Sequence, residues 1–171
     1  PGTLALVRRD IPQTVRQGMM PGIPQNDPDY YAAQVMDFIL GGSGFGSRLT
    51  EEIREKRGLT YGIYTYLADY DHVDVYGFGT STQNGNAGLM RDLIRKEFER
   101  MREAPVSAQE LADAQSYLTG AMPLMLSSTK AIAELLMGMQ LDKKPLDYLD
   151  GHKARIEAVT TRYGDDAALE D

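Results

Sequence analysis

Arg54 and Tyr61 are the two side chains of this sequence whose types and spacing best suit chemistry on a carbonyl group. They lie seven residues apart, at the two ends of the segment REKRGLTY. A guanidinium and a phenol both donate hydrogen bonds, so together they could bind a peptide carbonyl or stabilise an oxyanion. The same residues also fit a structural role, with Arg54 in a surface salt bridge, for example to Glu51, and Tyr61 half-buried on a strand. The residue types alone leave both interpretations open.

A glycine cluster stands shortly before this pair, with four glycines in the six residues from Gly41 to Gly46. A phosphate-binding P-loop would need a Lys directly after its last glycine, and a dinucleotide fingerprint would need a third, correctly spaced glycine after a strand. The cluster contains no Lys, and the segment before it has a helical pattern. We therefore interpret it as a turn between two helices, where the missing Cβ atoms let backbone approach backbone.

Few residues of this sequence suit metal, thiol or serine chemistry. It contains no Cys and only two His, His72 and His152, neither of which belongs to an H-E-x-x-H motif or its inverse. No Ser lies in a nucleophile-elbow sequence. The group Asp69, Asp71, His72 and Asp74 could in principle gather a hard cation, but an acidic hairpin tip is usually only solvated. We predict no catalytic centre and no metal site in this chain itself.

A short helix and a β-hairpin are predicted to position Arg54 and Tyr61. Ser47 is the expected N-cap of the helix, the acidic first turn and basic last turn suit the helix dipole, and Gly58 is the expected stop. Two runs rich in β-branched and aromatic residues follow, separated by a polar turn, and predict antiparallel strands at 59–68 and 73–82. Arg54 would then lie near the end of the helix and Tyr61 at the start of a strand.

The remaining elements are predicted from the periodicity of apolar residues and from the positions of Gly and Pro, which interrupt helices and strands. Strands are predicted at 3–7 and 13–20, and helices at 28–40, from 86, from 107 and from 129, with shorter helical turns at 145–149 and 151–159. Ser107 and Glu110 form a capping-box sequence, and Pro123 is predicted to bend or break the helix that follows. The buried face of the helix from 129 is predicted to consist of Ile132, Leu135, Leu136 and Met139.

This order of elements predicts an α+β fold. Strands, two helices, a hairpin and then several helices favour an antiparallel or mixed sheet with helices packed on one side over alternating βαβ units. The 171 residues, 42% of them hydrophobic, suffice for a core without disulfides or a structural metal. We interpret residues 1–171 as a single domain, excised from a longer chain.

Composition excludes several partners. With 18 Lys plus Arg against 25 Asp plus Glu, the formal charge is -7, so the chain lacks the positive field that draws proteins to nucleic acid. No apolar run approaches the roughly 20 residues that a membrane span needs. The N-terminus also lacks the residue order of a signal peptide. The sequence predicts a soluble acidic protein with neither a nucleic-acid partner nor a membrane span.

The segment ILGGSGFGSRLTEEIREKRGLTYGIY, residues 39–64, resembles the signature of the non-catalytic domain of the pitrilysin and insulinase family of zinc peptidases, the inverzincins. The similarity extends over most of the chain, including the helix DPDYYAAQVMDFILGG and the late segment IEAVT. The resemblance implies the two-layer sandwich of LuxS and mitochondrial processing peptidase. It also implies a domain that faces an H-x-x-E-H zinc domain across a chamber.

In that family the zinc-free domain donates an Arg and a Tyr, which correspond here to Arg54 and Tyr61. The resemblance implies that they hold the substrate backbone and help to stabilise the tetrahedral oxyanion, while the zinc belongs to the partner catalytic domain or subunit. The glycine turn would be a substrate-contact loop, with Gly42, Gly44, Phe45 and Gly46. The expected function is therefore peptide binding within a zinc metallopeptidase.

Three further expectations and one alternative come with the resemblance. Domains of this family normally end in a further helix and a strand, so the last piece of the sheet is expected to be missing, and an open edge could support a homodimer of the isolated segment. Many bacterial relatives suggest the periplasm as the compartment of the full-length protein. The alternative function is a non-proteolytic scaffold or assembly subunit, because some relatives have become structural parts of larger complexes.

Overall fold

The structure, a computed structural model, describes residues 10–42, 46–70 and 72–161, and its centre is a three-stranded antiparallel sheet. The strands are β1 (Gln13–Pro21), β2 (Ile63–Tyr70) and β3 (Val73–Gln83), in the order β1-β3-β2. The α-helices are α1 (Tyr30–Asp37), α2 (Ala87–Glu103), α3 (Ala108–Met125), α4 (Thr129–Leu141) and α5 (His152–Glu157). Two π-helical turns, η1 (Phe38–Gly42) and η2 (Thr50–Glu55), and a 3₁₀ turn, η3 (Asn84–Asn86), complete the described elements.

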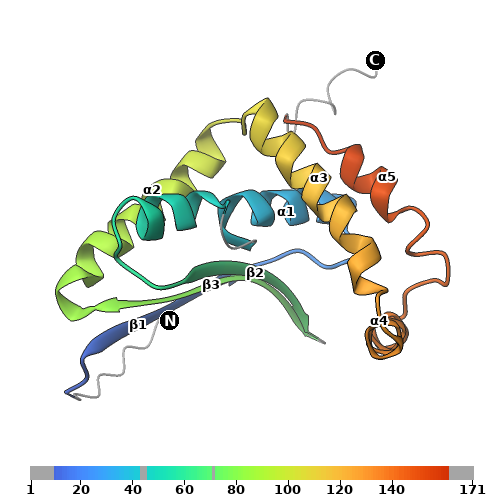
Figure 1. Cartoon of the computed structure of the whole chain (residues 1–171), viewed down its shortest axis with the longest axis horizontal. Helices are drawn as coiled ribbons and strands as arrows, with labels where there is room; N and C mark the ends of the chain where they lie inside the picture. The colour runs from blue at the N-terminus through green and yellow to red at the C-terminus, as the bar shows by residue number, and fades with distance from the viewer. Residues whose placement is uncertain (1–9, 43–45, 71, 162–171) are drawn as a thin grey trace.

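Helices α1, α2 and α3 lie over one face of the sheet, as Figure 1 shows. This arrangement confirms the predicted α+β class, and both strand pairings within the described residues are antiparallel rather than mixed. The predicted strand at 3–7 lies outside the described residues. No helix in the described part of the chain is long and apolar enough to cross a membrane.

Two apolar clusters hold the layers together. The first lies between the sheet and the helices that follow the glycine turn, and its buried members are Leu40, Leu49, Ile53, Ile63, Tyr76, Met90 and Ile94. The second joins α1 to α3 and α5, and its buried members are Val35, Ile39, Ala114 and Ile156. Leu49 and Ile53 have no exposed surface, so the short helix of the candidate site is anchored in the first cluster.

On the sheet face opposite the helices, two tyrosines of β2 each lie across from a glycine of β3. Tyr64 is paired with Gly79 and Tyr66 with Gly77 across the β2–β3 ladder, and directly opposed residues of an antiparallel pair point to the same face. A Cβ atom at either glycine would come within 2.5 Å of the opposing tyrosine side chain. The glycines of β3 thus leave room for both phenol rings to lie across the sheet.

Two details of the helical region differ from the sequence prediction. Helix α3 continues past Pro123 to Met125, so the predicted break is wrong, and the alternative of a bend at Pro123 stays a prediction. In α4, Met139 is buried as predicted, whereas Ile132 is 38% and Leu136 is 53% exposed. The predicted burial is therefore wrong for Ile132 and Leu136, because periodicity places apolar residues on one side of a helix but cannot show whether another element covers them. In the described structure α4 packs mainly against α3, so most of its apolar side chains remain in contact with solvent.

A buried salt bridge fastens the start of the short helix to α3. Arg48 donates from Nε and Nη2 to the two carboxylate oxygens of Glu110, at 2.6 and 3.0 Å, and its side chain is only 6% exposed. Glu110 also completes the predicted capping box with Ser107, whose backbone N–H donates to Oε2 at 2.8 Å. The hydrogen bonds from Arg48, followed by those from Ser107, lower the pKa of Glu110 to about 2.

We predict that Glu110→Gln lowers the free energy of unfolding by about 2 kcal/mol at pH 7, because it leaves the buried guanidinium without its counter-charge. The folded-state pKa of Glu110 is depressed from 4.5. Its stabilisation is therefore fully present above about pH 4.5 and is lost as the pH falls toward 2. Denaturant unfolding followed by circular dichroism at pH 7 and pH 3 should show a difference between the two proteins that shrinks at the lower pH.

Glu99→Gln is the matched control, because it removes the same charge from an exposed position of α2. It should change the free energy of unfolding by less than about 0.5 kcal/mol. Equal effects of the two substitutions would contradict a specific role for the salt bridge.

Candidate functional site

The short helix of the site follows Ser47, the predicted N-cap: residues 48–49 are α-helical and η2 continues the helix over Thr50–Glu55. The Ser47 hydroxyl accepts a hydrogen bond from the Thr50 N–H at 3.4 Å, and its carbonyl accepts one from the Glu51 N–H at 2.9 Å. The turns then widen, since the Lys56 N–H donates to the carbonyl of Glu51, five residues back, at 3.0 Å. A π-helical turn of this kind is rare and is often found at functional sites.

Gly58 ends this helix, also as predicted. Its φ is +61°, in the left-handed region, and apart from Gly58 itself and its two chain neighbours no described atom lies within 4 Å of the place a Cβ would occupy. Its N–H donates to the carbonyl of Arg54 at 2.8 Å, and the Leu59 N–H donates to the carbonyl of Ile53 at 3.0 Å. A glycine in this conformation closes the helix and reverses the chain toward β2.

The structure brings Arg54 and Tyr61 together on either side of this turn. The Cζ atom of Arg54 lies 5.4 Å from the centroid of the Tyr61 ring, within the range of a cation–π contact. Tyr61 is 91% exposed, which excludes the alternative of a half-buried strand tyrosine. Arg54 forms an ion pair with Glu55 at 3.4 Å, whereas Glu51 pairs with Lys56. The two donors therefore stand side by side at the protein surface.

The predicted substrate-contact loop is described only at its ends. Gly42 packs on Asp37, and a Cβ at this position would clash with the Asp37 carboxylate. Burial raises the pKa of that carboxyl above its ordinary value. Gly46 lies in open space. Gly44 and Phe45 lie outside the described residues. At Gly42, glycine therefore permits close packing against Asp37.

The described residues offer no set of ligands for zinc. Helix α1 contains neither His nor Glu. Within the ranges given above, no three His, Cys, Asp or Glu side chains gather closely enough to hold a metal ion. In the acidic hairpin, Asp69 and Asp74 face each other across the ladder, and Asp71 is not described. Zinc therefore does not fit the residues that the structure describes.

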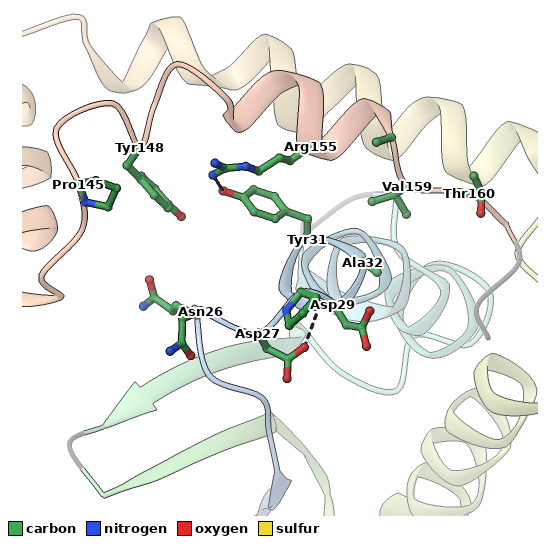
Figure 2. Close-up of a pocket in the computed structure, with 13 residues that line it drawn as sticks. Asn26, Asp27, Asp29, Tyr31, Ala32, Pro145, Tyr148, Arg155, Val159 and Thr160 are labelled. Atoms are coloured by element: carbon green, nitrogen blue, oxygen red, sulfur yellow. Dashed lines mark hydrogen bonds between the residues drawn. The ribbon is translucent and has the colours of Figure 1, made fainter. Parts of the chain in front are cut away.

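A pocket of about 620 Å³ lies elsewhere, between the start of α1 and the segment around α5, and Figure 2 shows its lining. Arg155 donates from Nη1 to the Tyr31 hydroxyl at 3.0 Å across this pocket. Sequence reasoning missed this contact because 124 residues separate its partners and no local pattern signals it. Neither Arg54 nor Tyr61 lines the pocket, so we do not place the candidate site there.

Comparison with known proteins identifies the class of this chain. Residues 1–118 match the family model described as the peptidase M16 inactive domain. The chain belongs to this family, which confirms the resemblance seen in the sequence.

Among relatives, the chain is 30% identical to an uncharacterised zinc protease of Streptomyces coelicolor, over 93% of its own length and 34% of that protein. It is 36% identical to a protein of Helicobacter pylori described as a non-peptidase homologue, over 56% of this chain and 22% of that protein. The chain thus spans about a third, or less, of the length of these relatives.

Among solved structures, the peptidase M16 inactive domain from Pseudomonas fluorescens superposes with a TM-score of 0.79 at 31% identity, over 88% of this chain and 36% of that one. The periplasmic protease PqqL of Escherichia coli superposes with a TM-score of 0.69 at 14% identity, over 90% of this chain and 17% of that one. The second likeness shows the fold alone.

We predict that Gly58→Ala destabilises the protein by about 1 kcal/mol, because an L-residue is strained at a φ of +61°. Gly62→Ala is the matched control, since Gly62 also has open space around it but no positive φ. The control should change the free energy of unfolding by less than about 0.5 kcal/mol. Thermal and denaturant unfolding of both variants measure this. If the order of stability were reversed, the left-handed turn would not be the constraint that ends the helix.

Proposed function

We propose that this chain is the substrate-binding, zinc-free half of a zinc metallopeptidase. The observation that carries the proposal is the pairing of Arg54 and Tyr61 at an exposed turn, 5.4 Å apart from guanidinium carbon to ring centroid. Both side chains are hydrogen-bond donors that reach the surface, since Tyr61 is 91% exposed and the Arg54 side chain is 30% exposed. Such a pair suits a carbonyl oxygen that approaches from outside, from a peptide held against another surface.

In the proposed reaction the two donors act on the carbonyl oxygen of the scissile peptide bond. The H-x-x-E-H half would hold the zinc ion, whose chemistry there would be to activate a water molecule and polarise the carbonyl. Arg54 and Tyr61 would donate hydrogen bonds to the substrate backbone and to the oxygen on which negative charge develops. The turn at 42–46, with Gly42, Gly44, Phe45 and Gly46, would contact the same peptide.

The comparisons support this proposal at the level of the family. The Streptomyces relative is described as a zinc protease, and the family model is that of an inactive peptidase domain. We further propose that residues 1–171 form one domain of a longer protein or assembly, and that it works in the periplasm, as the Escherichia coli protease with the same fold does.

Removing either donor from the protein combined with its H-x-x-E-H half should lower kcat/KM for peptide hydrolysis by about 100- to 1000-fold. Loss of one oxyanion donor typically costs about 3 to 4 kcal/mol of transition-state stabilisation. The variants are Arg54→Ala and Tyr61→Phe, and steady-state hydrolysis of a fluorogenic peptide measures the effect.

Arg57→Ala and Tyr70→Phe are the matched controls. Arg57 follows the same helix and pairs with Glu52, and Tyr70 ends β2 with 56% of its surface exposed. Both should retain kcat/KM within about twofold. Unchanged kinetics in Arg54→Ala and Tyr61→Phe would refute the assigned role of the pair.

The 171-residue chain alone should neither bind zinc tightly nor hydrolyse peptides, because its described residues contain no suitable ligand set. Isothermal titration with ZnCl₂ at pH 7.5 should show no saturable site tighter than about 10 μM, far weaker than structural zinc sites. A tight one-to-one site that supports hydrolysis would contradict the division of labour proposed here.

A non-proteolytic scaffold or assembly subunit is the second candidate function. The Helicobacter pylori relative, described as a non-peptidase homologue, favours it. The two functions differ in one observable feature, since only a protease requires an H-x-x-E-H domain or subunit bound to this chain. If affinity purification of the intact protein recovered no such partner, the scaffold function would be supported.

A further inference from the structure

Three buried threonines surround the backbone that presents Tyr61, and we propose that they are positioning residues for it. We name Thr60, Thr80 and Thr82 the threonine cluster. The inference rests on the proposed function, because it assigns these residues to the orientation of the Tyr61 donor. All three are buried, with exposed fractions of 9%, 6% and 4% for Thr60, Thr80 and Thr82.

The threonine cluster bonds to the backbone on both sides of Tyr61. The Thr82 hydroxyl donates to the carbonyl of Leu59 at 2.6 Å. The Thr80 hydroxyl donates to the carbonyl of Gly62 at 3.0 Å. The two carbonyls flank the segment that carries Tyr61, so both ends of that segment are tied to β3.

Thr60 adds a third tie, made from the loop itself. Its hydroxyl donates to the carbonyl of Ser81 at 2.7 Å and accepts from the Gly62 N–H at 3.2 Å. The Thr80 hydroxyl lies 3.2 Å from that of Thr60, so the two residues are in direct contact. Together these bonds span the whole four-residue connection from the helix end to β2.

These side-chain bonds begin where the strand ladder stops. The ladder between β2 and β3 ends at the pair Ile63 and Thr80. Residues 59–62 therefore lie beyond the register of the sheet, and the threonine hydroxyls take the place of ladder hydrogen bonds. Because a buried hydroxyl without a partner costs roughly 1–3 kcal/mol, threonine at 82 is favourable only while the Leu59 carbonyl stays in place.

Tyr61 depends on its backbone for orientation. With 91% of its surface exposed, its side chain gains little from packing, and ordering a loop residue costs about 1–2 kcal/mol of backbone entropy. The ties at residues 59, 60 and 62 supply that order before a substrate arrives. A donor placed in advance stabilises a transition state without reorganisation at the moment of reaction.

Thr80→Val and Thr82→Val test the proposal, because valine keeps the shape and removes the hydroxyl. In the protein combined with its H-x-x-E-H half, each should lower kcat by about three- to tenfold with little change in KM, since one hydrogen bond is worth about 1 kcal/mol. Thr82→Ser should restore kcat. Thr65→Val is the matched control: Thr65 is a buried threonine of β2 that faces Asp37, away from the Tyr61 loop, and its substitution should leave kcat unchanged.

A double-mutant cycle separates positioning from general destabilisation. In a Tyr61→Phe background, Thr82→Val should have no further effect on kcat, because the donor it positions is already gone. If the two losses instead multiplied, or if Thr65→Val lowered kcat equally, the proposal would be overturned.

Amide hydrogen exchange gives a readout that does not depend on catalysis. Exchange at Gly62 and Leu59 should accelerate about tenfold in Thr80→Val and Thr82→Val, relative to Thr65→Val. Unchanged exchange at these amides would overturn the proposal even if Tyr61→Phe lowered kcat. Accelerated exchange with full activity in Tyr61→Phe would instead refute the proposed function while confirming that the threonines fix this loop.

Discussion

The placement of the candidate site depends on the salt bridge between the buried guanidinium of Arg48 and the carboxylate of Glu110. Arg48 lies six residues before Arg54, and its side chain is 6% exposed. A charge in such a place is tolerated only with a counter-charge held in good geometry. Glu110 provides both carboxylate oxygens, and the same carboxylate caps the first turn of α3. One side chain therefore sets the position of the short helix relative to α3.

From this anchor outward, the site changes from buried and fixed to exposed. Leu49 and Ile53 have no exposed surface. The side chain of Arg54, the next residue, is 30% exposed, and Tyr61 is 91% exposed. The intervening turn is fixed by the left-handed Gly58 and by hydroxyls from the sheet. An exposed pair on a well-ordered backbone is suited to contact with another surface, because binding then loses little further backbone conformational entropy.

The parts of the structure that sequence predicted are those with local causes. Ser107 with Glu110, the stop at Gly58 and the β2–β3 hairpin each follow from residues within a few positions of one another. The Arg–Tyr pair was found in the same way, through a short motif. Contacts between distant segments were not predicted. Arg48 lies 62 residues from Glu110, and no sequence pattern around either residue indicates that the two are in contact. The exposure of the apolar side chains of α4 was not predicted either, because periodicity identifies an apolar helix face but not the element that would cover it.

The exposure of Tyr61 also sets a condition on any catalytic role. In water a donor exchanges one hydrogen bond for another, and its net contribution to binding a carbonyl is about 1 kcal/mol. The larger contribution of an oxyanion donor arises in a site from which water is excluded, where fixed dipoles act in a low dielectric. At 91% exposure, Tyr61 does not meet this condition within the described structure. The proposed role therefore requires a second surface that closes over the turn, and the same closure would bring a zinc-bearing half to the donors that this chain presents.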